Sequence, residues 1–360
     1  MTMQSSRPIA KLSVAEFLRC HLIHRDPLVI LSYGLPLGAP IQLSPFLADR
    51  RVYFLNGNWW SLCDPKELAR IKGYYAQLSN WYPKHRFLFL TNAPQEEQAL
   101  EAAGLPHFFC HHNTFLDEGI FRPLPRVKKT LDAVYTARLH PFKRQILARR
   151  IPSWGLLYYG DQTRAESQPA YLDYLRRAMP GMVCLNHDPA TDTYHRLTPQ
   201  EMCLAYNRAR VGLCLSRVEG GNYATTEYQL CGLPVVSTPS EGGRDVFLDP
   251  ETSRIVEPDT RAVAAAVAEL AARRFLPGEV RLRALARLRE HRLRFISLVE
   301  SILPGRAAPN PSPTASRPFS STRCLPTRAR RKSFWPPTAC CPVPRPGRPA
   351  RLVDKTGSRG

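Results

Sequence analysis

Short apolar runs alternate with segments of helix length along most of the 360-residue chain. The runs that predict strands lie at 27–34, 51–57, 85–92, 107–113, 131–139, 154–160, 182–186, 210–216 and 233–238. Strands that alternate with helices are typical of parallel sheets joined by crossover helices. The pattern therefore predicts an α/β protein whose sheets bind ligands beside the carboxyl ends of their strands.

A basic segment with two prolines, FRPLPRVKK (121–129), separates these runs into two groups. Such a segment is typical of a linker, so the sequence predicts an N-terminal domain over 1–125 and a second domain over 126–303. From about Leu276, apolar residues recur at helical spacing with arginines on the other face, which predicts a closing helix. A solvated face is the favoured interpretation of these arginines, and contact with a membrane surface is the alternative.

The last part of the chain, 304–360, has a different composition. From Gly305 onward there are twelve Lys and Arg, one acidic residue and eleven prolines, without any apolar periodicity. Such a segment buries too little apolar surface to fold, so a disordered tail is expected. The formal charge of the whole chain is +20, whereas the residues before the tail have 38 basic and 29 acidic side chains, or +9. A charge of that size suits phosphorylated ligands or an anionic membrane, and no specific nucleic-acid partner is expected.

The cysteines and the apolar stretches predict the compartment. Seven cysteines precede the tail, each single and several within apolar runs, which is typical of buried free thiols in a reducing compartment. No stretch has the length and apolarity of a signal peptide or of a membrane span. We therefore expect a cytoplasmic protein, with any membrane contact peripheral and at the inner face.

The stretch SRVEGGNYATTEYQLCGLPVVST (216–238) has two glutamates eight positions apart, Glu219 and Glu227. Glu219 comes just after a predicted strand, and Gly220 and Gly221 are expected to let the chain turn there. A short helix is predicted from Tyr223 to Cys231. Glu227 lies about one turn into that helix, so both carboxylates can reach the same crevice.

The chemistry of this stretch suits a ligand that has both hydroxyl and phosphate groups. Backbone N–H groups at a helix start favour phosphate, and they lie here at the carboxyl edge of the predicted sheet. The two glutamates on either side of these donors can accept hydrogen bonds from hydroxyl groups. A nucleotide sugar is a ligand of this kind.

The same stretch resembles the E-x7-E signature of family 4 glycosyltransferases, which are retaining enzymes. TARLHPFKR resembles the G-R-L-x-x-x-K segment of that family, with Arg138 and Lys143 in the matching places. HNTFLDEGIFRP is similar to the stretch between the two domains of the family, and the resemblance extends over most of 121–302. It implies a GT-B-like fold, in which two Rossmann-like domains face a cleft. It also implies transfer of a hexose from a nucleotide sugar to a glycan, lipid-linked or small-molecule acceptor, in cell-surface polysaccharide or glycolipid synthesis.

The resemblance assigns roles to four charged side chains. Arg138 and Lys143 would hold the diphosphate of the donor and offset the charge of the leaving group. Glu227 would accept hydrogen bonds from the ribose. Glu219 would bind hydroxyl groups of the transferred sugar and orient it for reaction, so the catalytic set is Glu219, Arg138 and Lys143.

The resemblance also assigns the segment between the glutamates. Backbone amides of Gly221, Asn222 and Tyr223, next to the turn at Gly220, would face the sugar and the β-phosphate. Asn222 stands where the family has glycine, so the sugar pocket is expected to be unusual. Because cationic side chains and amides offset the charge, no metal or other cofactor is required, and the chain contains no Asp-x-Asp motif.

The N-terminal half matches the family weakly, and several interpretations stay open. Trp59 and Trp60 stand where a histidine of many members is missing. We expect them to be core or acceptor-groove residues in preference to a stacking platform. We expect His111 and His112 to have a structural role between the domains in preference to binding a metal. The alternatives to a glycosyltransferase are an inactive relative, a sugar-phosphate enzyme of the same architecture, and a basic nucleic-acid-binding protein that uses the tail.

Overall fold

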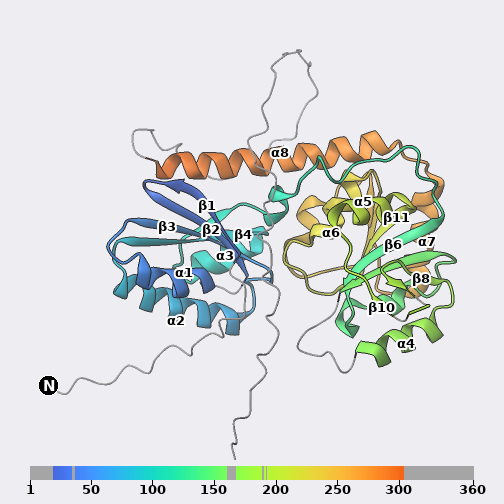
Figure 1. Ribbon diagram of the computed structural model, residues 1–360, viewed down its shortest axis with the longest axis horizontal. Coiled ribbons are helices and arrows are strands. Elements are labelled where there is room, and N and C mark those ends of the chain that lie inside the picture. Colours follow the sequence, from blue (N-terminus) through green and yellow to red (C-terminus); the bar gives the residue numbers. More distant parts are fainter. Residues whose placement is uncertain (1–18, 35–36, 160–167, 189, 192, 304–360) are drawn as a thin grey trace, which may run out of the picture. The chain divides into compact units, whose positions relative to one another are not determined.

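A computed structural model describes residues 19–34, 37–159, 168–188, 190–191 and 193–303. The described residues form two separate sheets built mainly of parallel strands, together with flanking helices (Figure 1). The predicted α/β class is therefore confirmed. The predicted disordered tail, 304–360, lies outside the described residues.

The first sheet has five strands in the order β1-β2-β3-β4-β5, and only β1 is antiparallel to its neighbour. The strands are β1 (Arg19–Arg25), β2 (Leu28–Gly34), β3 (Val52–Asn58), β4 (His85–Thr91) and β5 (His107–Phe109). The connections contain α1 (Gly38–Leu43), η1 (Ser44–Phe46), α2 (Pro65–Trp81) and α3 (Pro94–Ala102), and β5 is followed by η2 (His112–Phe115).

The order of this sheet decides how its two faces are covered. Strands β2 to β5 are added in one direction, and right-handed crossovers then place every connecting helix on the same face. One core cluster accordingly joins Phe54 and Phe89 to Ile71 of α2 and Leu100 of α3. The opposite face of the sheet is covered by another part of the chain.

That part is the long C-terminal helix α8 (Pro277–Ile302), which crosses from one sheet to the other in Figure 1. Phe295 and Leu298 of α8 pack against Leu31 and Leu55 on the uncovered face of the first sheet. The first half of α8 packs instead on the core of the second sheet, through Ala284 and Leu288. A helix is thus present from about Leu276 as the sequence pattern indicated, and its packing joins the two halves of the chain.

The second sheet is entirely parallel, in the order β13-β12-β11-β6-β7-β8. Its strands are β6 (Leu131–Arg138), β7 (Trp154–Tyr159), β8 (Met182–Cys184), β11 (Ala209–Cys214), β12 (Val235–Ser237) and β13 (Ser253–Ile255). The remaining elements are η3 (Pro141–Lys143), η4 (Gln145–Ala148), α4 (Gln168–Ala178), a small hairpin of β9 (His187–Asp188) and β10 (Thr193–Tyr194), α5 (Pro199–Asn207), α6 (Tyr223–Leu230), η6 (Gly243–Phe247) and α7 (Thr260–Ala272).

Strand order reverses in this second sheet between β6 and β11. The chain adds β7 and β8 on one side of β6, and then β11, β12 and β13 on the other side. In open parallel sheets, ligands bind outside the carboxyl ends of the strands at such a switch point. Residues that follow β6 and β11 therefore occupy the favoured position for a ligand site.

Local sequence signals explain most element boundaries. A capping box begins α5, because Thr198 accepts from the backbone N–H of Glu201 while the Glu201 side chain accepts from that of Thr198. Gly104 and Gly232 end their helices with φ of +69° and +81°, a conformation that favours glycine. The strand predicted over 107–113 is shorter than expected. It gives way to η2, whose first N–H groups include one that donates to His111 Nδ1.

The expectation that the free thiols are buried needs correction. Four cysteines are buried (Cys110, Cys203, Cys214 and Cys231), whereas Cys63 is exposed, so the described free thiols are not all buried.

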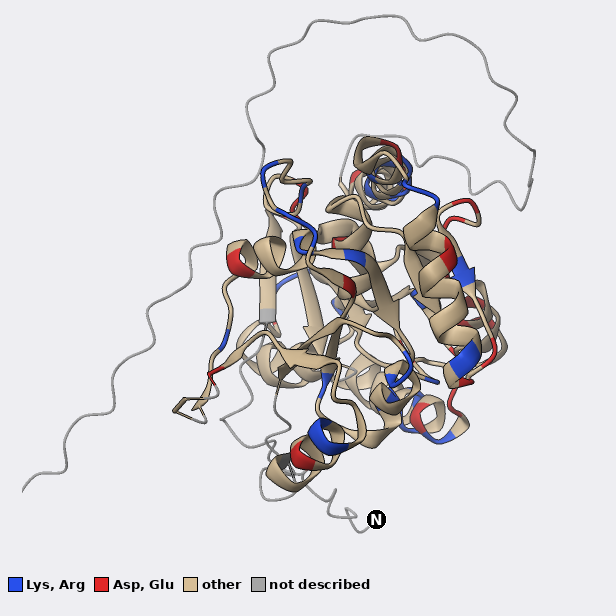
Figure 2. Cartoon of the chain, turned by 90° about the vertical axis from the view of Figure 1, so that its right-hand side faces the viewer, with Lys and Arg blue, Asp and Glu red and all other residues tan. Residues whose placement is uncertain are grey.

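No helix in the described part of the chain combines the length and apolarity needed to cross a membrane. Basic and acidic residues are interspersed on the helices seen in Figure 2.

Candidate active site

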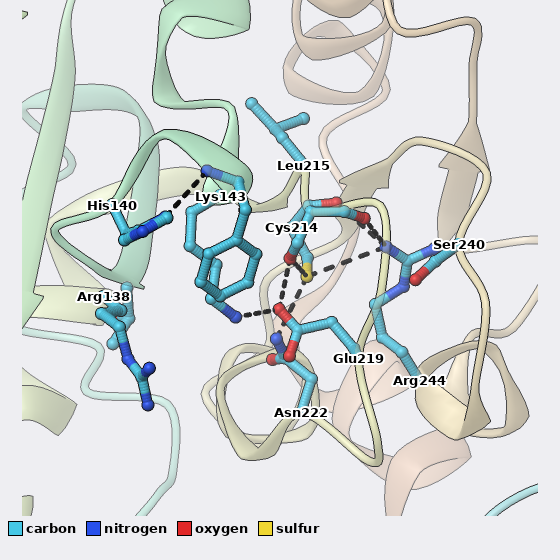
Figure 3. Close-up of polar contacts among 12 residues, drawn as sticks. Arg138, His140, Lys143, Cys214, Leu215, Glu219, Asn222, Ser240 and Arg244 are labelled. Atoms are coloured by element: carbon cyan, nitrogen blue, oxygen red, sulfur yellow. Dashed lines mark hydrogen bonds and ion pairs between the residues drawn. The ribbon is translucent and has the colours of Figure 1, made fainter. Parts of the chain in front are cut away.

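Lys143 and Glu219 form an ion pair at the switch point of the second sheet (Figure 3). Lys143 follows the end of β6 at Arg138, and Glu219 follows the end of β11 at Cys214. Both side chains are about nine-tenths buried, and the paired oxygen of Glu219 also accepts from Ser216 Oγ. Because β6 and β11 are neighbours, residues predicted from two separate motifs meet at one point.

Arg138 lies at the end of β6, near the same point. Its guanidinium group lies over the ring of Trp60, 5.6 Å from the ring centroid. Trp60 is 50% exposed, so it is not a core residue and it presents an aromatic surface beside the cationic group. Its neighbour Trp59 is half-buried and packs edge-on against the ring of Tyr223, with a centroid distance of 5.8 Å.

The segment that carries Glu219 is held by a buried arginine that the sequence interpretation missed. Arg244 is fully buried and donates to the carbonyl groups of Ser216 at 3.2 Å and Thr238 at 2.6 Å. Its charge is paired with Asp245 at 2.7 Å. Since Ser216 and Thr238 follow β11 and β12, Arg244 fixes the loops at the carboxyl edge of the sheet. The sequence signal that could have pointed to it is the glycine pair directly before Arg244, in EGGRDVF (241–247).

The chain bends at both glycines of the motif, as expected, but the requirement for glycine there has another cause. Neither Gly220 nor Gly221 has a positive φ, and the left-handed residue is Asn222, with φ of 52°. A Cβ on Gly220 would lie 2.5 Å from the carbonyl oxygen of Trp59, and one on Gly221 would lie 2.3 Å from Nε2 of His112. Glycine is therefore required for close approach to the N-terminal half of the chain.

Asn222 is the N-cap residue of α6 and directly precedes the first helical residue, Tyr223. Its side-chain oxygen accepts from the backbone N–H of Thr225 at 3.1 Å, which satisfies one of the first N–H groups of α6. Its amide nitrogen donates to Cys214 Sγ at 3.2 Å, which ties the helix start to the end of β11. The side chain of Asn222 thus has two structural partners, so its backbone amide is the group left to the proposed sugar contact.

The glycine contact gives a first testable prediction. Gly221→Ala should lower the free energy of unfolding by about 1–3 kcal/mol, because the new methyl group overlaps the His112 ring in a packed contact. Gly73→Ala in α2 is the matched control, since a Cβ there meets nothing within 4 Å. The control should be neutral or gain up to about 1 kcal/mol. Chemical unfolding of both variants measures the difference, and equal stability of the two would show that the close approach is wrong.

Glu227, the second glutamate, lies within α6 and is mostly buried. The residue is 8% exposed, and one carboxylate oxygen accepts a hydrogen bond from Tyr206 Oη at 2.8 Å. Burial raises the pKa of Glu227 to about 7, and the hydrogen bond from Tyr206 opposes that shift only in part. Only a small part of the residue is open to a ligand in this structure, and its contact with ribose stays a prediction.

The raised pKa of Glu227 predicts a pH-dependent stability. The folded state holds this proton more tightly than the unfolded state, so its contribution is complete below about pH 4.5 and is lost as the pH rises through 7. Glu227→Gln cannot ionise and keeps a similar shape. At pH 8 the variant should exceed the wild type in stability by at most about 3 kcal/mol, and at pH 4.5 the gain should disappear.

Thermal unfolding midpoints of both proteins at pH 4.5, 6 and 8 measure this effect. Glu257→Gln, at an exposed position, is the control and should leave the midpoint unchanged throughout. A gain for Glu227→Gln that is the same at every pH would contradict ionisation of Glu227 as its cause.

His111 and the start of η2 connect the two halves of the chain. His111 Nε2 lies 2.9 Å from the carbonyl oxygen of Gly243, and its backbone N–H donates to Nδ1 of His291 on α8 at 3.3 Å. Asn113 donates to Gly221 and Asn222 carbonyl groups and to Thr226 Oγ1. These contacts fit the structural role expected for this segment. Within the described ranges, no group of three or more His, Cys, Asp and Glu side chains could hold a metal ion.

Comparison with known proteins places these residues in a family domain. Residues 138–273, from the end of β6 to the end of α7, match the family model described as "Glycosyl transferases group 1", so the chain carries a domain of this kind. The matched range contains Arg138, Lys143, Glu219 and Glu227. No curated protein matches the chain.

Solved structures of glycosyltransferases match both halves of the chain at low identity. Sucrose-phosphate synthase from Thermosynechococcus elongatus is 16% identical, with a TM-score of 0.58 over 76% of this chain and 73% of that protein. HepE from Anabaena, in complex with UDP, is 13% identical, with a TM-score of 0.55 over 76% and 78%. The pneumococcal O-GlcNAc transferase GtfA, in complex with UDP and GlcNAc, is 13% identical, with a TM-score of 0.54 over 76% and 56%. The likeness shows a GT-B fold, which confirms the predicted fold class.

Proposed function

We propose that this protein is a retaining glycosyltransferase that transfers a hexose from a nucleotide sugar to a hydroxyl group of an acceptor. The observation that carries the proposal is the Lys143–Glu219 pair at the switch point, within the segment that matches glycosyl transferases group 1. Two of the structures with the same fold contain UDP, which makes a UDP-sugar the first donor to test. The acceptor is proposed to be a glycan, a lipid-linked sugar or a small molecule.

The ion pair suggests how a donor would enter the site. A diphosphate near Lys143 and Arg138 would compete with Glu219 for the ammonium group, since phosphate oxygens accept strong charge-assisted hydrogen bonds. Glu219 would then be left to accept from hydroxyl groups of the transferred sugar. The pair thus holds both charged groups ready in a mostly buried site without leaving either one unpaired.

Electrostatic stabilisation is the proposed source of rate acceleration. Negative charge builds on the diphosphate as it departs, and groups aimed at that charge in a water-poor site lower the barrier. Arg138, Lys143 and the backbone amides of Gly221, Asn222 and Tyr223 are the proposed groups. Glu219 would position the sugar as its anomeric carbon gains positive charge. We propose that these groups are sufficient without a divalent metal.

A binding screen with the full chain tests the proposal. Thermal unfolding is followed with UDP-, GDP- and ADP-sugars and with the bare nucleotides, with a chelator present. One nucleotide series should raise the midpoint by several degrees, since a ligand at 100 times its Kd adds about 2.7 kcal/mol of stability. No stabilisation by any series would contradict the proposal. Stabilisation without turnover would favour an inactive relative, and stabilisation by RNA alone would favour the nucleic-acid-binding alternative.

A further inference from the structure

Buried polar atoms without a hydrogen-bond partner gather at the carboxyl edge of the first sheet. They are Oη of Tyr33, both side-chain amide atoms of Asn58, and both ring nitrogens of His112, beside which the backbone carbonyl group of Asn58 lies without hydrogen-bond geometry. Tyr33 and Asn58 lie at the ends of β2 and β3, and His112 follows β5, so the parallel strands bring all three to one edge. Asn58 is 2% exposed and His112 is 3% exposed.

The clustering of these atoms requires an explanation, because each buried polar atom without a partner lowers the stability of the folded state. A buried donor or acceptor that has lost water without gaining a partner costs about 1–3 kcal/mol. Native proteins keep few of them, and functional roles, bound ions or ordered water account for some of those that remain. Half of the unpartnered buried side-chain atoms found in the described ranges belong to these three residues. Packing alone gives no reason to keep three polar side chains here.

His112 faces the segment proposed to hold the sugar of the donor, and Tyr33 lies beside His112. The His112 ring lies 4.6 Å from the ring of Tyr223 and 6.2 Å from that of Tyr33, measured between centroids. Its Nε2 is the atom nearest to the position that a Cβ on Gly221 would take. Trp59 completes an aromatic wall, since its ring contacts both His112 and Tyr223. Aromatic walls with a few buried polar groups are typical of small-molecule sites.

The chemistry of the group favours an uncharged polar ligand. Burial lowers the pKa of His112 to about 4, with only partial opposition from the nearby Asn58 carbonyl group, so the imidazole is neutral. A neutral imidazole, an amide and a phenol each offer both a donor and an acceptor. Hydroxyl groups, which also donate and accept, match this set better than phosphate, which requires donors and positive charge.

We propose that Tyr33, Asn58 and His112 form a subsite for the hydroxyl groups of a sugar ring, which becomes accessible when the Gly220–Gly221 segment moves away from Trp59 and His112. The inference rests on the proposed function and extends it to the N-terminal half. The contact between the glycines and this edge leaves polar atoms unsatisfied, and the hydroxyl groups of a bound sugar would satisfy them. The sugar is either the one transferred or that of the acceptor.

Two conservative variants separate a ligand role from a structural one. Tyr33→Phe and Asn58→Leu remove the unpartnered atoms while keeping similar shapes. Because those atoms make no hydrogen bond in the protein, both variants should unfold at the wild-type temperature or above it. Both should also weaken sugar recognition by about 10-fold, which corresponds to the loss of one hydrogen bond. Ser253→Ala is the matched control, since its hydroxyl is likewise buried and unpartnered but follows β12 at the start of β13.

The readouts identify which sugar the subsite binds. Calorimetric titration of UDP and of the UDP-sugar gives two affinities for each protein. If the subsite binds the transferred sugar, the variants lose affinity for the UDP-sugar and keep that for UDP. If it binds the acceptor, both affinities stay at the wild-type values and the acceptor KM rises at saturating donor. Ser253→Ala should change neither.

Two results would overturn the inference. One is wild-type affinity and wild-type acceptor KM in both variants, and the other is a lower unfolding temperature with unchanged recognition, which would show a structural role. If the wild-type protein binds no nucleotide sugar, the proposed function fails and the inference fails with it. Failure of the inference alone is recognised by normal binding in the wild type and in both variants.

Discussion

Glu219→Gln is expected to lower kcat by about 100-fold while the donor KM changes little. The amide keeps the size of the side chain and can still accept a hydrogen bond, but it cannot support positive charge on the anomeric carbon as the diphosphate leaves. Loss of one positioned electrostatic group has an effect of this size. The structure adds a reason for the small effect on KM: Lys143, which Glu219 binds in the ligand-free protein, becomes more available to the diphosphate.

Steady-state kinetics at saturating acceptor measures this effect, with Glu257→Gln as the exposed control. Glu227→Ala is the informative contrast, since it should raise the donor KM and leave kcat close to the wild-type value. A ribose contact is present in the ground state and the transition state alike, so its loss weakens both equally. If the two glutamate variants show the same kinetic defect, the division of roles between them is wrong.

The double substitution Arg138→Ala/Lys143→Ala is expected to weaken nucleotide-sugar binding by at least about 100-fold. Each side chain would contribute a charge-assisted hydrogen bond to the diphosphate, worth about 1.5–3 kcal/mol. Affinity for the bare nucleoside should stay within a few-fold of the wild-type value, because it has no phosphate. Calorimetric titrations with both ligands measure the contrast.

The control for this double variant is Arg149→Ala/Arg150→Ala, which removes the same charge at two exposed positions after η4. It should bind both ligands as the wild type does. An equal loss of nucleoside and nucleotide-sugar affinity in the site variant would indicate damage to the fold. Unfolding temperatures of both double variants identify that case, since Lys143→Ala leaves the mostly buried Glu219 carboxylate without its cation.

Much of the fold follows from the sequence because the strands are buried on both faces. Apolar runs of that kind are recognisable without knowledge of the partners, and nearly all the predicted runs became strands. The strands that were not predicted are β1, β13 and the two strands of the hairpin β9–β10. They are short or lie at sheet edges, where pairing with a neighbour decides the structure more than local composition does.

The candidate site shows more clearly that features determined by distant residues cannot be predicted from the local sequence. Lys143 and Glu219 could be predicted because both belong to motifs and both follow strands. The requirement for glycine at positions 220 and 221 could not be read correctly, because it arises from Trp59 and His112, more than a hundred residues away. Arg244 was missed for a related reason: its partners are carbonyl groups of other loops, and these leave no pattern in the sequence.

The central claim is that the chain transfers a sugar from a nucleotide donor with retention of configuration. Proton NMR of the full-length protein with the nucleotide sugar selected by the binding screen tests it most directly, with a chelator present. The spectrum should show release of the nucleoside diphosphate and a product whose anomeric proton has the coupling constant of the donor configuration, and Glu219→Gln should slow both signals about 100-fold. Release that starts only after Mg²⁺ or Mn²⁺ is added, or a product of inverted configuration, would contradict the account.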